Sequence, residues 1–345
     1  MNDLTPQFPV SGAGLGLRRP IADKLMADPP TDVDFMEVAP ENWIHVGGAL
    51  GRKFRWFTER YPFVIHGLSL SIGGPAPLDE QLVRDIKAFM AEHGIRMYSE
   101  HLSYCGDDGQ LYDLMPIPFT EDAVGYVADR VRRVQDILEQ RIALENVSYY
   151  APTDTSLSEA DFVNAVLEEA DCDLMLDINN IVVNSINHRY NPAEFLQAMP
   201  AERIRYFHLA GHFVEDEDLR IDTHGSPVDE QAWCLLKQAY ELFGPVPTLL
   251  ERDFNFPPLE ELLDEVRRMG LGITEVQPQI SGGWRGSARW PSSAVATCPM
   301  SSAGWACRAS GTPAATASSW PGRRARRFRL RTGGSSSART SCRTA

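Results

Sequence analysis

The sequence lacks any long apolar run: no stretch near 18 residues is hydrophobic enough to cross a membrane. Its first ten residues, MNDLTPQFPV, lack the basic start and apolar core of a secretory signal. We therefore expect a cytoplasmic protein without membrane association. Cysteine is scarce too, with six residues and no CxxC pair, which argues against a structural Cys-zinc site and for scattered reduced thiols.

Negative charge and lysine are missing from one end of the chain. From Val276 onward there is no Asp, Glu or Lys, but eleven Arg. Residues 1–275 therefore hold all 47 acids against 22 of the 33 bases, a net charge of -25. Such an acidic body repels nucleic acid and suits metal ions or a basic partner.

The same change in composition divides the chain into two parts. Residues 1–275 have the composition of a globular domain, whereas residues 276–345 are rich in Arg, Ser and Ala and show no periodicity. We expect this extension to be disordered or the product of an out-of-frame reading. A functional basic tail that binds an acidic partner is the other interpretation.

Eight segments of the first part repeat one pattern: a short apolar run, a polar stop and a helical stretch. Eight such units in about 270 residues match a (β/α)8 TIM barrel in number and size. A doubly wound open sheet is the alternative, but no Gly-rich phosphate fingerprint follows the first run. The runs are residues 12–17, 33–38, 63–65, 95–98, 142–144, 174–176, 204–207 and 248–250.

Local signals mark several of the intervening helices. Thr120 stands at an N-cap position, and Ser158 with Asp161 resembles a capping box. A helix is expected over about residues 79–93, and Pro192 is expected to begin the helix after the sixth run.

The residues that stop these runs are mostly imidazoles and carboxylates. Because the carboxyl ends of barrel strands converge on one mouth, we expect them to lie together. A lone acid or histidine there usually makes a hydrogen bond or salt bridge, but many such groups cannot share a low-dielectric mouth unless protonated, paired or neutralised by cations. We predict a site for two or three divalent ions. Its members are His66, His101, Glu145, Asp177, His208 and Glu251, with Asp222 and His224 from the loop after the seventh run.

The donor types narrow the chemistry. Nitrogen and oxygen ligands of this mix suit Fe, Mn or Zn, and the residues alone do not choose among them. No lysine stands at a strand end, which excludes Schiff-base chemistry.

Further polar residues lie near the predicted mouth. Glu37 and Asn42 lie at the end of the second run and are candidates for contacting substrate or for hydrogen-bonding the metal ligands from outside. A purely structural role in a turn is an equal alternative for both residues. His188 and His212 lie in adjacent loops and are candidates of the same kind, and Arg18 is a candidate partner for a carboxylate.

Nine motifs agree in order and spacing with one known family. They are GAGLGLR, DFMEVAPENW, HGLSLSIG, SEHLSY, LENV, LDINNIVVNSINH, HLAGH, IDTHG and LERD. Over about residues 12–270 the chain thus resembles the multinuclear non-heme iron-dependent oxidative enzymes. That family includes the iron oxidase of methanobactin synthesis and enzymes that modify cysteines of ribosomally made peptides. The resemblance implies a TIM barrel of the xylose-isomerase-like type.

The resemblance also implies roles for the residues named above. All eight strand-end and loop residues are implied to be iron ligands, with His101, Glu145 and Asp177 at the centre of the chemistry and Glu145 bridging two irons. Asn180 stands where the methanobactin enzyme has a further histidine; asparagine is a weaker ligand, so two irons are implied and a third stays open. Dioxygen would oxidise a cysteine of a precursor peptide, giving oxazolone–thioamide or thiooxazole products, often with a second protein that presents the leader.

Other classes compete with this interpretation. A divalent-metal sugar isomerase or an endonuclease of the related barrel superfamily also places Glu, Asp, His and Glu at strands five to eight. A nuclease needs a cationic rim, which a body of charge -25 does not offer, and such isomerases usually keep a lysine beside the metal. A non-catalytic metal-binding scaffold would hold iron without consuming oxygen.

Overall fold

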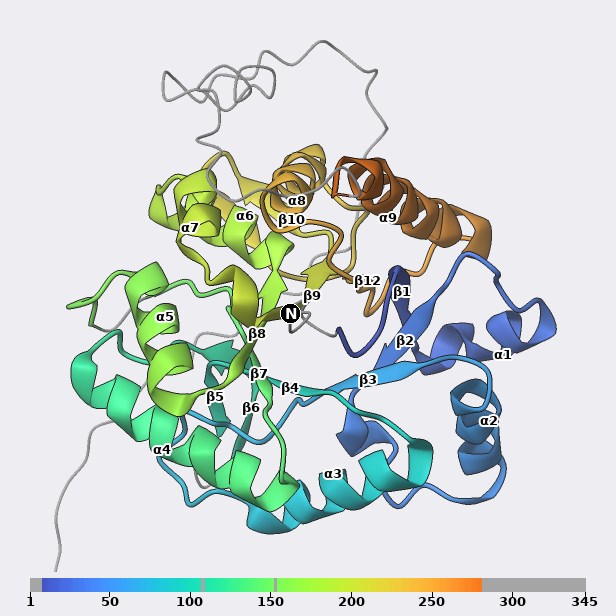
Figure 1. Ribbon diagram of the computed structural model, residues 1–345, viewed down its shortest axis with the longest axis horizontal. Coiled ribbons are helices and arrows are strands. Elements are labelled where there is room, and N and C mark those ends of the chain that lie inside the picture. Colours follow the sequence, from blue (N-terminus) through green and yellow to red (C-terminus); the bar gives the residue numbers. More distant parts are fainter. Residues whose placement is uncertain (1–7, 107–108, 152–153, 281–345) are drawn as a thin grey trace, which may run out of the picture. The chain divides into compact units, whose positions relative to one another are not determined.

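The computed structural model describes residues 8–106, 109–151 and 154–280. Eight parallel strands close into a barrel in the order β1-β12-β9-β8-β7-β4-β3-β2, and helices lie around the outside of this ring (Figure 1). The predicted TIM barrel is confirmed. Its strands are β1 (Ala13–Gly16), β2 (Phe35–Val38), β3 (Phe63–His66), β4 (Tyr98–His101), β7 (Ala143–Glu145), β8 (Asp173–Asp177), β9 (Ile204–Leu209) and β12 (Thr248–Leu250).

Helix starts follow the local capping signals. The Thr120 side chain accepts a hydrogen bond from the Ala123 amide and begins α4 (Glu121–Leu138). Ser158 accepts from the Asp161 amide and therefore caps α5 (Glu159–Ala170) as predicted, while the Asp161 carboxylate accepts from the Ser158 hydroxyl and not from the backbone amide as in a full capping box. The other helices are α1 (Arg19–Ala27), α2 (Gly48–Thr58), α3 (Glu80–His93), α6 (Ile178–His188), α7 (Pro192–Ala198), α8 (Glu230–Phe243) and α9 (Leu259–Ile280).

Two elements differ from the prediction. The fourth strand was expected at residues 95–98, but β4 pairs with its neighbours from Tyr98 to His101, because its polar end is buried in the barrel instead of ending the strand. The helix after β8 was expected to begin at Pro192, where α7 does begin, but α6 already starts after Asp177. The Asp177 carboxylate caps α6 by accepting from the Asn180 amide.

Two hairpins fill loops that the sequence left unassigned. The loop after β4 forms β5 (Tyr104–Gly106) and β6 (Gln110–Met115), and the loop after β9 forms β10 (Phe213–Asp216) and β11 (Leu219–Ile221). Both follow carboxyl ends of barrel strands and therefore belong to the mouth side of the barrel.

Some expectations concern residues outside the described ranges. The predicted extension begins at residue 276, and its first five residues, 276–280, continue helix α9. Residues 281–345 lie outside the described ranges, so the expected disorder or out-of-frame origin of the extension stays a prediction. Among the described helices, none combines the length and the hydropathy needed to span a membrane.

Apolar side chains fill the barrel and the space between its strands and helices. The layer between strands and helices is the larger, and full burial of each aliphatic or aromatic side chain in it contributes about 1.5–3 kcal/mol. A smaller cluster fills the barrel interior; its members are Val10, Phe35, Val64, Met97, Ala143, Met175, Tyr206 and Leu249.

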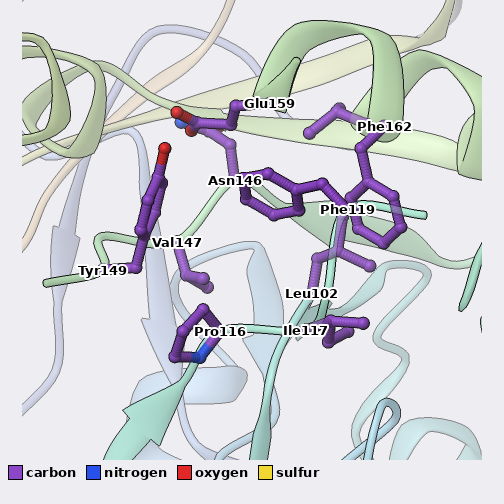
Figure 2. Close-up of a pocket in the computed structure, with 10 residues that line it drawn as sticks. Leu102, Pro116, Ile117, Phe119, Asn146, Val147, Tyr149, Glu159 and Phe162 are labelled. Atoms are coloured by element: carbon purple, nitrogen blue, oxygen red, sulfur yellow. The ribbon is translucent and has the colours of Figure 1, made fainter. Parts of the chain in front are cut away.

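A small cavity lies under the connection between β7 and α5 (Figure 2). Its volume of about 10 Å³ leaves room for a single water, and its lining includes none of the predicted ligands. Glu159 is a buried member of this lining, together with Phe119 and Phe162, and its carboxyl group points toward the Tyr149 hydroxyl (Figure 2). Burial raises the pKa of Glu159 to about 7, although the Asn184 side chain donates a hydrogen bond of 3.0 Å to its carboxylate.

This buried carboxyl makes stability depend on pH. An unfolded glutamate ionises near ~4.3, so from there to about 7 the unfolded chain loses a proton that the folded chain keeps, and folding becomes less favourable as pH rises. We therefore expect Glu159→Gln to raise the thermal midpoint at pH 8 and to leave it nearly unchanged at pH 5. Thermal unfolding at both pH values measures this, with Glu168→Gln on the exposed side of α5 as the control. An equal gain at both pH values would refute the protonated state.

Candidate metal centre

A layer of polar side chains lies directly above the apolar filling of the barrel. On an extended strand, residues i and i+2 face the same side, so the residue two positions after an interior apolar residue faces the same interior. On seven strands that residue is polar and buried. The pairs are Phe35 and Glu37, Val64 and His66, Met97 and Ser99, Ala143 and Glu145, Met175 and Asp177, Tyr206 and His208, and Leu249 and Glu251.

The first group of possible ligands consists of His66, His101 and Glu145. The Glu145 Oε2 atom lies 3.0 Å from His66 Nε2 and 3.3 Å from His101 Nε2. The two imidazole Nε2 atoms are 3.1 Å apart. Three donor atoms thus converge from three adjacent strands, β3, β4 and β7.

The second group shares Glu145 with the first and adds Asp177 and His208. It is the most deeply buried of the three: the Glu145 side chain is 3% exposed, and those of Asp177 and His208 are fully buried. His208 Nδ1 lies 4.0 Å from Asp177 Oδ2. This group therefore sits where water is excluded and charge is most costly.

The third group shares Asp177 with the second and adds His224 and Glu251. His224 Nδ1 lies 3.4 Å from Glu251 Oε2, and its Nε2 lies 2.8 Å from Asp222 Oδ1. Asp222 stands beside this group and accepts from Ser148 Oγ at 3.1 Å. The eight predicted residues are thus brought together at one mouth, with Glu145 and Asp177 each common to two groups.

Several atoms in these groups are buried without hydrogen-bond partners among the described residues. They include Glu145 Oε2, Asp177 Oδ2, His208 Nδ1 and His224 Nε2. Buried polar atoms are normally satisfied, and a cation shared between an imidazole nitrogen and a carboxylate oxygen that face each other would satisfy both. Donor types, burial and shared carboxylates all fit divalent metal ions.

The crowding of charge shifts pKa values in both directions. Burial, with Glu145 and Asp222 nearby, raises the pKa of Asp177 to about 8. Burial alone would raise the pKa of Glu145, but His101 and His66 lower it to about 2. Burial alone would lower the pKa of His101, but the Glu145 carboxylate raises this pKa to about 9. Protons thus balance the metal-free cluster, and a bound metal ion would displace them.

Asn180 and Arg18 hold the carboxylates from behind. The Asn180 side chain donates to Glu145 Oε1 at 3.0 Å, and its backbone amide donates to Asp177 Oδ1 at 2.6 Å. Asn180 therefore orients both shared carboxylates. Arg18 contacts Glu251 at 2.7 Å and Asp253 at 2.8 Å, as expected of a partner for the acidic mouth.

The remaining predicted residues divide into two sets. Glu37 accepts from His208 Nε2 at 2.9 Å, and His212 Nδ1 lies 2.8 Å from Asn179 Oδ1, whose amide donates to Asp222. Glu37 and His212 therefore act behind possible ligands.

Asn42 and His188 lie elsewhere. Asn42 is exposed in the 3-10 turn Pro40–Asn42, where its carbonyl accepts from Arg19. His188 stacks on Tyr149 with ring centroids 4.0 Å apart and contacts its carbonyl at 2.8 Å. Neither residue belongs to a ligand group.

Sequence reasoning missed Ser99 and Tyr206. Ser99 Oγ lies 2.8 Å from His66 Nδ1, and Tyr206 donates to Glu37 at 2.8 Å. The spacing of two from Met97 would have placed Ser99 in the polar layer, whereas Tyr206 has the position of an ordinary core aromatic.

Comparison with known proteins gives the family. Residues 12–271 match the family model described as RiPP precursor modification enzyme MbnB/TglH/ChrH, where RiPP denotes a ribosomally made, post-translationally modified peptide. A UPF0276 protein of Alcanivorax borkumensis is 58% identical over 285 residues, covering 80% of this chain and 95% of that protein. One from Nitrosospira multiformis is 60% identical over 267 residues, covering 77% and 94%.

Solved structures are similar in fold alone. An L-ribulose 3-epimerase superposes with a TM-score of 0.52 at 13% identity, covering 81% of this chain and 96% of that one. A xylose isomerase domain protein from Planctomyces limnophilus gives 0.50 at 16% identity, covering 81% and 100%. The xylose-isomerase-like barrel is thereby confirmed, as is the family resemblance drawn from the nine motifs: the chain belongs to the MbnB/TglH/ChrH family of RiPP precursor modification enzymes.

Proposed function

We propose that this protein is a cytoplasmic non-heme iron oxidase that uses dioxygen to modify cysteine residues of a ribosomally made precursor peptide. One observation carries the proposal: three groups of imidazoles and carboxylates join at Glu145 and Asp177 in a chain of a precursor-modifying family. Two or three iron ions would be held there, with His101, Glu145 and Asp177 nearest the reacting atoms. The proposed ligands are His66, His101, Glu145, Asp177, His208, Asp222, His224 and Glu251.

The proposal of iron rests on the family resemblance, because the donor set alone also suits a second redox-active metal, Mn. Nitrogen and oxygen donors without thiolate suit Fe, Mn or Zn, and zinc has no redox chemistry of its own. Bound iron supplies the electron transfer to dioxygen that no side chain provides. The chain's part is to hold the ligands, balance their charge and exclude water.

The exposure of the groups indicates where a substrate enters. The second group is buried, whereas the side chain of His101 is 13% exposed and those of His224 and Asp222 are each 15% exposed. A peptide sulfur can therefore approach the first or the third group while the shared carboxylates stay dry.

Apolar side chains around the mouth favour a peptide as the substrate. Among the described residues, seven of the ten exposed large hydrophobic side chains lie on loops that follow barrel strands. A sugar substrate would not need such a rim, whereas exposed apolar groups beside a site mark protein or peptide docking. The seven are Leu68, Leu111, Met115, Tyr150, Phe213, Val214 and Phe254.

The hairpin β10–β11 adds charge to this rim. Phe213 and Val214 are followed by four consecutive acids, residues 215–218, and the hairpin leads directly into Asp222 and His224. The Asn187 side chain fixes it to α6 by bonding both the amide and the carbonyl of Arg220, at 2.8 and 2.9 Å. We extend the proposal to a basic leader segment bound here, presented by a second protein.

The competing classes have less support in the residues present. The chain's four lysines (Lys24, Lys53, Lys87 and Lys237) all lie on outer helices, so none stands beside the metal groups as in a sugar isomerase. The acidic body opposes binding of DNA. A non-catalytic metal scaffold remains as an outcome of the oxidation experiment below.

Removing a shared carboxylate should remove metal from two groups at once. After anaerobic loading with Fe(II), we expect Glu145→Ala to retain metal only at the third group and Asp177→Ala only at the first, because each residue belongs to two groups. Elemental analysis of desalted protein measures this, with exposed Glu168→Ala as the control. Wild-type iron content in both variants would refute the ligand assignment.

The oxidase activity is tested with a precursor peptide. The candidate substrate is the product of any short cysteine-bearing reading frame found beside the gene, and co-production with the iron-loaded protein should change the peptide mass and consume dioxygen. Cysteine→serine variants of the peptide should stay unmodified. Iron-loaded protein that consumes no oxygen with this peptide but epimerises ketohexoses would overturn the proposal; inactivity in both assays would favour the scaffold.

The apolar rim should contribute to peptide affinity and not to metal binding. We expect Phe213→Ser with Val214→Ser to raise the KM for the precursor about tenfold, the effect of ~1.4 kcal/mol of lost contact, with unchanged iron content. Leu242→Ser on the outer helix α8 is the matched control, since that side chain is also exposed but distant in sequence from the mouth loops. An unchanged KM would exclude this hairpin from peptide docking.

A further inference from the structure

A continuous chain of buried hydrogen bonds crosses the barrel interior and joins two of the possible ligands. His66 Nδ1 lies 2.8 Å from Ser99 Oγ, which lies 2.7 Å from the Tyr206 hydroxyl. Tyr206 donates to Glu37 Oε2 at 2.8 Å, and the same oxygen lies 2.9 Å from His208 Nε2. All five side chains are buried and come from strands β2, β3, β4 and β9.

The Glu37 carboxylate, between Tyr206 and His208, fixes the direction of every hydrogen bond in this series. A carboxylate oxygen only accepts, so Glu37 takes one hydrogen from the Tyr206 hydroxyl and one from His208 Nε2. Having donated its only hydrogen, Tyr206 must accept from Ser99. Because the Ser99 hydroxyl donates its hydrogen to Tyr206, it must accept a hydrogen bond from a protonated His66 Nδ1.

A second possible acceptor for Ser99 does not change this direction. The Ile65 carbonyl lies 3.4 Å from Ser99 Oγ, whereas the Tyr206 hydroxyl lies at 2.7 Å, so the shorter bond is the stronger one.

The direction of the chain decides which ring nitrogens are free to bind metal. With Nδ1 of His66 protonated, its Nε2 keeps a lone pair and faces Glu145 Oε2 at 3.0 Å in the first group. Because Nε2 of His208 donates to Glu37, only its Nδ1 is available to a metal ion, and this atom faces Glu251 Oε2 at 3.2 Å without a hydrogen-bond partner. His66 therefore offers Nε2 to a metal ion and His208 offers Nδ1, and both choices follow from the hydrogen bonds that Glu37 accepts.

We propose that Glu37 is a positioning residue that sets the tautomers of His66 and His208 together, acting on His66 at a distance through Tyr206 and Ser99. This inference rests on the metal-binding part of the proposed function and is independent of the substrate. Because Tyr206 also belongs to the apolar cluster that fills the barrel, this series of hydrogen bonds is anchored in packed core. Histidine ligands elsewhere are oriented by such partners, whose loss lowers metal affinity about 10–100-fold.

The direct test uses Zn(II) alone as a diamagnetic probe of protein labelled with ¹⁵N-histidine. Two-bond ¹H–¹⁵N correlation spectra identify the metal-bound ring nitrogen, and competition with a chelator gives the affinity. In the wild-type protein we expect zinc at Nε2 of His66 and at Nδ1 of His208. In Glu37→Gln, an amide can present a donor to Tyr206 and reverse the chain, so affinity should fall about tenfold at both histidines.

A double-mutant cycle isolates the action at a distance. In a Tyr206→Phe background, Glu37→Gln should still weaken zinc binding at His208 but should no longer change it at His66. Ser99→Ala should affect His66 alone. Tyr240→Phe is the matched control, since Tyr240 is a buried tyrosine that bonds Thr248 at 2.6 Å outside this chain, and thermal midpoints of the metal-free variants report folding.

The outcomes separate the two proposals. Unchanged nitrogens and affinities in Glu37→Gln, or an effect on His66 that survives in the Tyr206→Phe background, would overturn the positioning role while leaving metal binding intact. A wild-type protein that takes up no zinc at either histidine would overturn both proposals. Metal binding as expected, with no oxidation of the precursor by the iron-loaded protein, would overturn only the oxidase.

Discussion

The structure depends on one electrostatic constraint: carboxylates and imidazoles from separate strands share a mouth that excludes water. An ion buried without a partner costs several kcal/mol even after relaxation, so this arrangement persists only when opposite charges balance. In the metal-free chain protons make the balance: burial and the neighbouring Glu145 and Asp222 raise the pKa of Asp177 to about 8, and the Glu145 carboxylate outweighs burial and raises the pKa of His101 to about 9. Divalent ions would offer the same balance and would also occupy the lone pairs that the protein leaves unpartnered.

The same strands that fill the barrel present the site, which couples stability to function. Each apolar interior residue from β2 to β12 is followed two positions later by a polar one, so a shift of one residue in any strand would turn both of them away from the barrel interior. Asp177 shows the coupling at a single residue. Its carboxylate ends β8, caps α6 and belongs to two ligand groups, so the helix start also fixes the rotamer of a shared ligand.

The sequence was informative wherever the chemistry is local. Apolar runs predict all eight barrel strands, and Ser158 with Asp161 predicts a helix start, because short-range sterics and capping decide both. β4 was placed three residues early, since a polar Ser-Glu-His end looks like a loop until burial among other polar groups is known. Tyr206 and Glu37 could not be paired from the sequence: they are 169 residues apart, and closure of the barrel brings them together.

The likeness to sugar epimerases and the membership of a peptide-modifying family are compatible, because the barrel determines where a site lies and not what it does. Any parallel barrel gathers its strand ends at one mouth. This chain gathers many possible donors there, including two carboxylates that each belong to two groups, and the loops after β4 and β9 form hairpins with exposed apolar side chains. A zinc ion in a protein takes three or four protein ligands, so eight convergent donors are more than one such ion would use. In the proposed iron oxidase, Glu145 and Asp177 would each contribute to two neighbouring metal groups. Such an arrangement would suit the redox chemistry that we propose, whereas an epimerisation transfers no net electrons and would not require it.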